Sequence, residues 1–186
     1  MSDVSNVSAA KPAVGGSLSV APLGTDLPTT ADEALDAAFT TLGYISDAGL
    51  TNSNGASVTA HKAWGGDIVL VTQDEKPDNF KFSLIEVLDV DVLKFIYGDD
   101  NVSGTLATGI TVKANNAEPE TRSLVFDMIM RDGNLQRIVI ENGQITEMED
   151  IVYVDNDLVG FDVTVAAYPD SDNDTHKAYI LEAPSA

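Results

Sequence analysis

The sequence predicts a mainly β fold with two short helices. Apolar and polar residues alternate with a period of two over much of residues 68–181, which is typical of strands that bury one face. Only two stretches combine helical spacing with helix start and stop signals. Because the open edges of a large sheet aggregate, such a sheet must be covered or closed. We therefore expect one domain over residues 16–186, a β-sandwich or partial barrel flanked by the helices.

The N-terminal segment is expected to be a flexible arm. Residues 1–15 are mostly small and polar, so they become ordered only where something holds them. Leu18 and Val20 alternate with serine and predict a short strand. Pro22 and Gly24 then interrupt the chain.

The first predicted helix begins at Thr30 and ends at Gly43. Thr30 and Glu33 have the spacing of a capping box, in which each side chain accepts a hydrogen bond from the other residue's backbone. Leu35 and Leu42 lie on one face of this helix, and glycine adopts the left-handed conformation that ends it. We expect the helix to pack on the sheet.

The second predicted helix lies between Asp89 and Gly98. Asp89 is a suitable N-cap, and Asp91 lies near the positive end of the helix dipole. Glycine ends the helix at residue 98. Its apolar stripe consists of Val90, Leu93 and Tyr97. A helix this short depends on packing against the sheet.

A long polar connection, residues 46–66, separates the first helix from the main run of strands. Connections of this length are unusual in a compact domain and are typically functional or disordered. Trp64, the only tryptophan, lies near its end. A tryptophan in a polar loop either packs back on its own core or inserts into a neighbour, since tryptophan is enriched at interface hot spots. The sequence leaves both alternatives open.

The strands are predicted from their alternation and from the turns between them. Residues 74–79 form the turn of a hairpin between the strands 68–73 and 80–84. Asp132-Gly133 and Asn142-Gly143 are tight-turn signals. A loop is expected over 104–109 and a hairpin loop over 170–174. The other strand patterns cover residues 110–112, 124–130, 135–141, 145–154, 161–165 and 179–181.

The charge and composition exclude several classes of function. Among 186 residues, 30 are Asp or Glu and 10 are Lys or Arg, which gives a formal net charge of −20. A general nucleic-acid binder needs a basic face, so this class is disfavoured, as is binding to an anionic membrane. The chain contains no cysteine, which excludes disulfides, a thiol nucleophile and thiolate metal sites.

The acidity is concentrated toward the C-terminus, where residues 141–186 hold 11 carboxylates and one base, Lys177. Two explanations stay open. Charge of one sign keeps proteins soluble. Alternatively, an anionic wall repels DNA phosphates and lets DNA pass without adhering.

No motif predicts catalysis, a cofactor or a metal. The two histidines, His61 and His176, are expected to be ordinary polar residues, and no nucleophile-elbow or phosphate-loop sequence occurs. Residues 170–174 begin like a calcium loop, but Thr175 stands where glycine is needed and Leu181 where glutamate is needed. No signal peptide and no apolar run of about 20 residues is present, so we expect a soluble chain made in a cytoplasm.

Several segments together resemble the major tail tube proteins of siphophages, particularly those of actinobacterial phages. The similarity covers roughly residues 14–168, and the order and spacing of the segments carry it. They are VGGS (14–17), APLG (21–24), ALDAAF (34–39), LGYI (42–45), GLTN (49–52), KAWGG (62–66) and FKFSLIE (80–86), which continues through residues 92–93 to 97–98.

The resemblance implies a structural subunit of the virion tail. Subunits would form hexameric rings that stack into a tube, and each would contribute strands to a closed inner β-barrel through which the genome leaves. The partners would be other copies, tail terminator and tail-tip or tape-measure proteins, and passing double-stranded DNA, with no catalysis and no cofactor. Loops such as 46–66 would contact neighbouring subunits, with Leu50 and Trp64 as interface candidates. The candidates for an acidic lumen are Asp127, Glu141, Glu147 and Glu149.

Two other classes of function remain. A β-sandwich adhesion module of a virion or cell surface would bind a glycan or protein through an exposed aromatic residue, and Trp64 is the strongest candidate. A small hydrolase would require His61 or His176 for activity.

Overall fold

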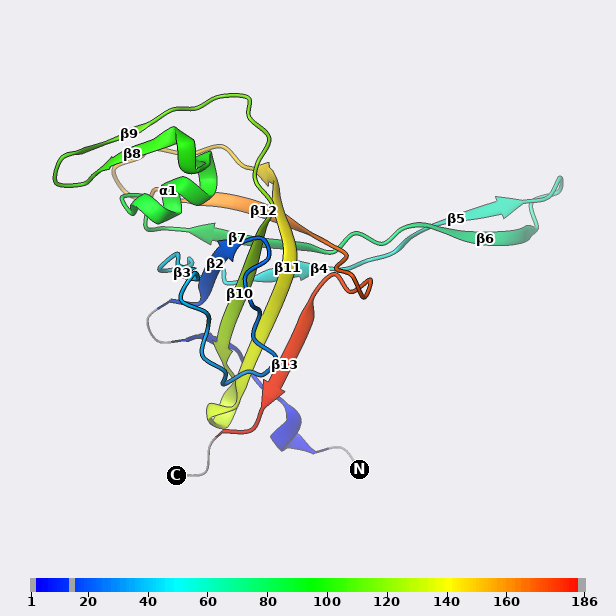
Figure 1. Ribbon diagram of the computed structural model, residues 1–186. Coiled ribbons are helices and arrows are strands. Elements are labelled where there is room, and N and C mark those ends of the chain that lie inside the picture. Colours follow the sequence, from blue (N-terminus) through cyan, green and yellow to red (C-terminus); the bar gives the residue numbers. More distant parts are fainter. Residues whose placement is uncertain (1–2, 14–15, 184–186) are drawn as a thin grey trace.

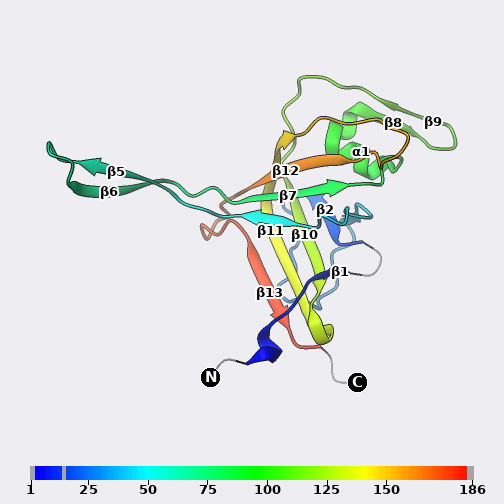
Figure 2. The ribbon, with the colours of Figure 1, turned by 180° about the vertical axis from the view of Figure 1, so that it is seen from behind.

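The computed structural model describes residues 3–13 and 16–183, and these form a mainly antiparallel β structure with one α-helix (Figures 1 and 2). The largest sheet has the order β3-β2-β10-β11-β12-β7-β4, with β1 beside β10 and β13 beside β11. Its strands are β1 (Lys11–Pro12), β2 (Leu18–Pro22), β3 (Thr40–Thr41), β4 (Thr51–Ser53), β7 (Asn79–Leu84), β10 (Arg122–Ile129), β11 (Leu135–Met148), β12 (Phe161–Tyr168) and β13 (Lys177–Leu181).

Two separate hairpins and four helical segments complete the described chain. The hairpins are β5 (Ser57–Lys62) with β6 (Ile68–Glu75), and β8 (Val102–Thr105) with β9 (Gly109–Val112). The helix α1 spans Val90–Tyr97, and the 3₁₀ turns are η1 (Val4–Asn6), η2 (Asp99–Asn101) and η3 (Arg131–Gly133).

The long strand β11 bends the sheet into two layers that cross steeply in Figure 1. The first layer contains β2, β10, β13 and the N-terminal half of β11, and the second contains the C-terminal half of β11 with β12, β7 and β4. Register shifts occur between Arg122 and Leu124 of β10 and between Ile145 and Glu147 of β11. Such bulges increase twist and bend a strand.

The predicted turn at Asn142-Gly143 is wrong, because β11 continues through it. A Cβ at Gly143 would lie 2.3 Å from Cδ1 of Leu124 and 3.1 Å from Cγ1 of Val165. Glycine is therefore required at the bend, where side chains of the two layers approach the backbone closely. Gly143 is therefore explained by close packing of the two layers and not by a turn.

The main core lies between the two layers. The ring of Phe126 in the first layer stacks against Phe80 at 6.1 Å and meets Phe82 edge-on at 5.4 Å, both from the second layer. Leu124 and Val163 are buried in the same cluster. This arrangement confirms a mainly β, sandwich-like fold, and the described strands do not close into a barrel within one chain.

The first predicted helix, 30–43, is wrong: no α-helix forms there. Residues 23–39, here called the strap, run without regular structure over the outward face of the first layer (Figure 1). Nη1 of Arg137 donates hydrogen bonds to the backbone oxygens of Thr30, at 3.1 Å, and Glu33, at 2.6 Å. A helix would need these two carbonyls for its own first turns. The carboxylate of Glu33 instead accepts from the backbone N–H of Thr29 at 2.7 Å.

The side chain of Arg137 holds the strap on the sheet through these hydrogen bonds. Arg137 is 6% exposed. Its guanidinium also donates two hydrogen bonds to the carboxylate of Asp127, from Nε to Oδ1 at 2.6 Å and from Nη2 to Oδ2 at 3.1 Å. Val125 and Val139 flank it on the outward face and are buried too, although neither belongs to the main core cluster. The strap thus closes a second, smaller apolar layer.

The pairing of the strands differs from the prediction in two places. Residues 68–73 do not pair with 80–84: β6 pairs with β5, from the predicted polar loop, and β7 pairs with β12 and β4. The loop over 170–174 does not close a β12–β13 hairpin, because both strands pair with β11, one after the other. Local alternation identifies a strand but not its partner, which depends on tertiary packing.

The boundaries of two further elements also differ. The strand predicted over 145–154 ends at Met148, and the predicted loop 104–109 is mostly the hairpin of β8 and β9. Where the signals were local and complete, the predictions are confirmed. The carboxylate of Asp89 caps α1, Gly98 ends it with a φ of 91°, and a tight turn through Asp132 joins β10 to β11.

The buried carboxylate of Asp78 fastens the root of the β5–β6 hairpin to the body. Its side chain is 1% exposed. It accepts hydrogen bonds from Nδ2 of Asn52 at 2.7 Å, Oγ1 of Thr175 at 2.6 Å and Nδ1 of His176 at 2.5 Å. Burial alone would raise the pKa of Asp78, but the bonds from Thr175, Asn52 and His176 outweigh it and hold the pKa below its ordinary value.

We predict that Arg137→Met lowers the free energy of unfolding by about 2–4 kcal/mol, because Asp127 and two strap carbonyls lose their partner. Denaturant titration measures this loss. The control Arg131→Met removes a guanidinium that is 56% exposed, so the loss should stay under about 0.5 kcal/mol. Equal losses of unfolding free energy in the two variants would contradict the role of Arg137 in holding the strap.

We predict that Asp78 stabilises the fold only where it is ionised. Because its pKa is lower in the folded state, its contribution is present above the ordinary value of 3.8 and disappears as the pH falls through the folded value. The stability difference between the natural chain and Asp78→Asn, measured by urea titration, should therefore be large at neutral pH and shrink in acid. The exposed replacement Asp132→Asn should show no comparable difference, and a gap for Asp78→Asn that does not change with pH would contradict the assignment.

Candidate assembly surfaces

The β5–β6 hairpin projects far from the body of the molecule (Figures 1 and 2). All of β5 is exposed, as is all of β6 except Thr72. An isolated two-stranded hairpin is at best marginally stable in water, and contiguous exposed apolar surface marks an interaction site. Its exposed large apolar residues are Val58, Trp64, Ile68, Val69, Leu70 and Val71.

The two faces of the hairpin differ. On one face, polar side chains form cross-strand hydrogen bonds: Thr59 Oγ1 to Asp74 Oδ2 at 2.5 Å, and His61 Nε2 to Thr72 Oγ1 at 3.1 Å. His61 is thus part of a polar ladder. Leu70, opposite His61, lies on this face as well. The other face presents Val58, Ala60 and Val71 beside Gln73 and is the more apolar of the two.

The two interface candidates lie in different places. Trp64 is at the hairpin tip with its side chain fully exposed (107%), so it does not pack on its own core. Leu50 is half-buried and lines a pocket of about 310 Å³, together with Pro12, Ile45 and Met128. Of the two, only Trp64 is free to enter a neighbour without rearrangement.

The four acidic candidates divide between the two layers. Asp127 and Glu141 lie on the outward face of the first layer, where Asp127 is paired with Arg137 beneath the strap. Glu147 and Glu149 are exposed on the outward face of the second layer. There Glu149 forms an ion pair with Lys81 and holds the pKa of that lysine above its ordinary value. The structure therefore does not bring the four candidates to one face.

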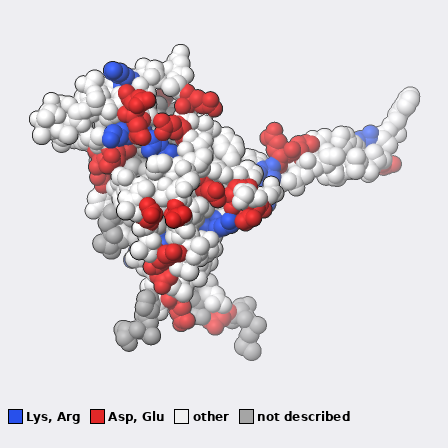
Figure 3. Space-filling model, in the orientation of Figure 1, with Lys and Arg blue, Asp and Glu red and all other residues white. Residues whose placement is uncertain are grey.

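Acidic side chains form several groups on the visible surface and outnumber the basic ones there, while most of that surface is uncharged (Figure 3). The 170–174 loop contains its own cation. Asp170 accepts backbone bonds from Asp172 and Asp174 at 2.9 Å each, and its Oδ2 lies 2.7 Å from Nζ of Lys177. That ammonium group holds the pKa of Asp170 below its ordinary value. Lys177 thus takes the place that a metal ion would have in such a loop.

Four strands of the largest described sheet pair on one side only: β1 pairs with β10 and β3 pairs with β2, and two further strands lie at the other edges. β4 pairs with β7, and β13 pairs with β11. Ile180 of β13 is mostly exposed. Such edges present unpaired backbone N–H and C=O groups, which are templates for pairing with another chain.

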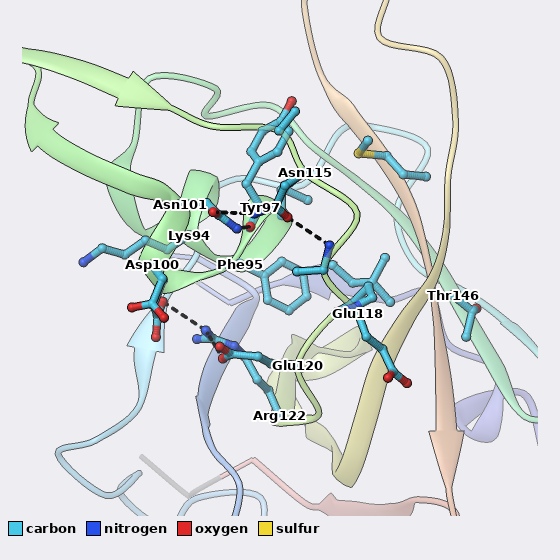
Figure 4. Close-up of a pocket in the computed structure, with 18 of the residues that line it drawn as sticks. Lys94, Phe95, Tyr97, Asp100, Asn101, Asn115, Glu118, Glu120, Arg122 and Thr146 are labelled. Carbon is cyan, nitrogen blue, oxygen red and sulfur yellow. Dashed lines mark hydrogen bonds and ion pairs between the residues drawn. The ribbon is translucent and has the colours of Figure 1, made fainter.

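A pocket of about 470 Å³, here called the α1 pocket, lies beside α1, between the end of β11 and the connection 114–120 (Figure 4). Arg122 forms ion pairs with Asp99 at 3.0 Å and Glu120 at 2.8 Å. Nδ2 of Asn101 donates to the backbone oxygen of Tyr97 at 2.7 Å. Five carboxylates and two bases line this pocket.

Sequence reasoning missed this pocket and the exposed character of residues 68–71. The pocket's residues come from three separated segments, and only the fold brings them together. A signal for the hairpin was present, because Ile68, Val69, Leu70 and Val71 are apolar on both faces of one strand. A continuous apolar run indicates a strand whose two faces both become covered.

The described residues contain no cluster of three or more His, Asp or Glu side chains that could hold a metal ion. His176 is engaged with the buried Asp78, at the edge of the Phe80 ring. Among the described helices, none has the length and apolar character needed to cross a bilayer.

Comparison with known proteins identifies the family. A search of curated proteins finds no match. A family model described as phage tail tube protein matches residues 5–185. Because this match spans nearly the whole chain, the protein belongs to the phage tail tube protein family and has a structural role in the bacteriophage tail.

Proposed function

We propose that copies of this chain form hexameric rings that stack into a hollow tube, and that the genome passes through this tube during ejection without catalysis. The observation that carries the proposal is the projecting β5–β6 hairpin. It exposes a run of large apolar residues that the chain's own core does not cover. Such a surface supports contact with further copies in a chain of this family.

The outward face of the second layer is the better candidate for the lumen. The strap covers the outward face of the first layer and buries Val125 and Val139, so that face is not free to line a channel. Glu147, Glu149 and Lys81 lie on the uncovered face. An excess of carboxylates there repels DNA phosphates and disfavours adhesion.

The open edges of β4 and β13 support ring closure by strand pairing between copies, which would complete an inner barrel. The arm 1–15 and the segment 46–66 would be fixed by neighbouring rings, so that elongation follows a nucleus. Part of the arm is already held in the single chain, where β1 pairs with β10. The tube would end on tail terminator and tail-tip or tape-measure proteins.

An adhesion module of the virion is the second candidate, supported by the exposed Trp64 at a projecting tip. Negative-stain microscopy of the purified protein separates the two functions. Rings or hollow rods support a tube subunit, and a sample that stays monodisperse at high concentration supports adhesion.

We predict that a chain without the outer part of the hairpin folds but does not form tubes. Replacing residues 59–72 with Asn-Gly joins Val58 to Gln73, which face each other in register, through a tight turn. The variant should stay monomeric and folded, because none of the described core residues comes from β5 or β6. Sedimentation and negative-stain microscopy test assembly.

The control variant replaces residues 106–108 with Asn-Gly, which shortens the other exposed hairpin between Thr105 and Gly109. It should assemble normally. Normal tubes from the chain with the truncated β5–β6 hairpin would contradict the role of that hairpin.

We predict that Glu149→Lys converts a tube that repels DNA into one that retains it. The replacement places a second ammonium group beside Lys81 in every subunit of the proposed lumen. Retention of a short DNA duplex by purified tubes should rise and should fall steeply with added salt. Asp132→Lys makes the same charge change outside the second layer and should retain no more than the natural tube. Equal retention by both variants would place the lumen elsewhere.

A further inference from the structure

We propose that the α1 pocket is the receptor for the hairpin tip of an adjacent copy, with Trp64 as the anchor and Lys62 against the acidic rim. This inference rests on the proposed function, since it requires assembled copies. It names the contact by which one chain holds the next.

The tip and the pocket lie on opposite sides of one molecule. In both ribbon views the hairpin extends away from the side that carries α1, β8 and β9 (Figures 1 and 2). The tip therefore does not reach its own pocket, and the contact must join two copies. A head-to-tail contact of this kind propagates, and it generates a ring when the rotation closes or a filament when it does not.

The pocket suits a large aromatic side chain. Its volume of about 470 Å³ lies within the range of sites that bury small ligands. Tyr97 and Met148 line it, and both tyrosine rings and thioether sulfurs make favourable contacts with an indole. Trp64 is fully exposed and has no contact with its own core to lose. Tryptophan is enriched among the residues that contribute most to the binding energy of protein interfaces.

The tip carries one base, Lys62, and one acid, Asp67, and the base is the charge that complements the acidic rim of the pocket. Lys62, one of only ten Lys and Arg residues, lies two positions before Trp64. Within the pocket, Asp99 and Glu120 already neutralise Arg122. The rim retains the carboxylates of Asp100 and Glu118, while Lys94 is the remaining base. In a chain with a net charge of −20, this pairing gives the encounter between two copies a favourable orientation.

The smaller pocket, of about 310 Å³, is a poorer receptor. Residues 10–12 of the chain's own arm form one of its walls, and Lys11 there would repel Lys62. Asp47 is its one carboxylate among the described lining residues. The position of Lys62 beside Trp64 therefore favours the larger pocket.

The single tryptophan makes the test direct, because all tryptophan fluorescence of the chain comes from Trp64. Free chains should emit as a water-exposed indole and be quenched freely by acrylamide. Assembled chains should emit at shorter wavelength, with several-fold weaker quenching. Tubes that are visible by electron microscopy but keep the emission of a water-exposed indole would overturn this inference and leave the proposed function standing. Absence of any tube would instead count against the proposed function.

Substitutions then identify the receptor. Trp64→Ala should raise the concentration needed for assembly by about 30-fold or more, the factor that corresponds to the loss of about 2 kcal/mol at an interface hot spot. Lys62→Glu and Glu118→Lys should each weaken assembly, and the chain carrying both should recover most of the loss, as expected of a direct pair. Lys76→Glu makes the same charge change at the hairpin root and is the control for Lys62→Glu.

Crosslinking provides a readout that does not depend on affinity. The chain has no cysteine, so a mixture of the Ala63→Cys and Glu118→Cys variants has one thiol per chain. The crosslinks that can form are therefore the mixed pair and the two pairs of identical variants. A short bismaleimide should give the mixed dimer during assembly far more efficiently than it joins Ala63→Cys to Asp132→Cys, which lies at the turn between β10 and β11. Equal crosslinking yields from the two mixtures would contradict docking of the tip in this pocket. Failure of the chain carrying both Lys62→Glu and Glu118→Lys to recover assembly would contradict it as well.

Discussion

The bend in β11 is the constraint on which the other surfaces depend. One continuous strand supplies a member to each layer, and the bend requires that residue 143 have no side chain, so that Leu124 and Val165 can meet across it. Because the layers cross, the strap covers the outward face of the first layer only, and the outward face of the second layer is not covered by it. The same strand ends beside α1, where it completes the α1 pocket. The core, the proposed channel face and the proposed docking pocket therefore depend on one backbone feature.

The sequence predicted those elements whose causes are close in sequence. Asp89 and Gly98 are at the ends of the helix that they define, and that helix was found where expected. The helix expected after Thr30 had equally good local signals, yet Arg137, more than 100 residues away, binds the carbonyls that this helix would need. Local propensity is a weak prior, and a buried charge that must be satisfied overrides it.

The strand pairings failed for a related reason. The run from Ile68 to Val71 was expected to belong to a strand that pairs with residues 80–84 in a hairpin of the domain. In the single chain all four residues are exposed. An apolar sequence pattern predicts that a surface becomes buried, but it does not predict whether the same chain or another copy buries it. Residues of assembly interfaces are therefore where sequence rules based on single domains are expected to fail.

The high negative charge sets a condition on assembly. Copies that each carry a net charge of −20 repel one another, and at physiological salt this repulsion extends over a Debye length of about 8 Å. Only contacts of short range that bury apolar surface can overcome it, and these form only in correctly aligned copies. The hairpin concentrates such surface in one projecting element and places one of the chain's few bases next to its aromatic tip. On this proposal, attraction is confined to the sites of contact, and the wall of the proposed channel keeps the negative charge that repels phosphate.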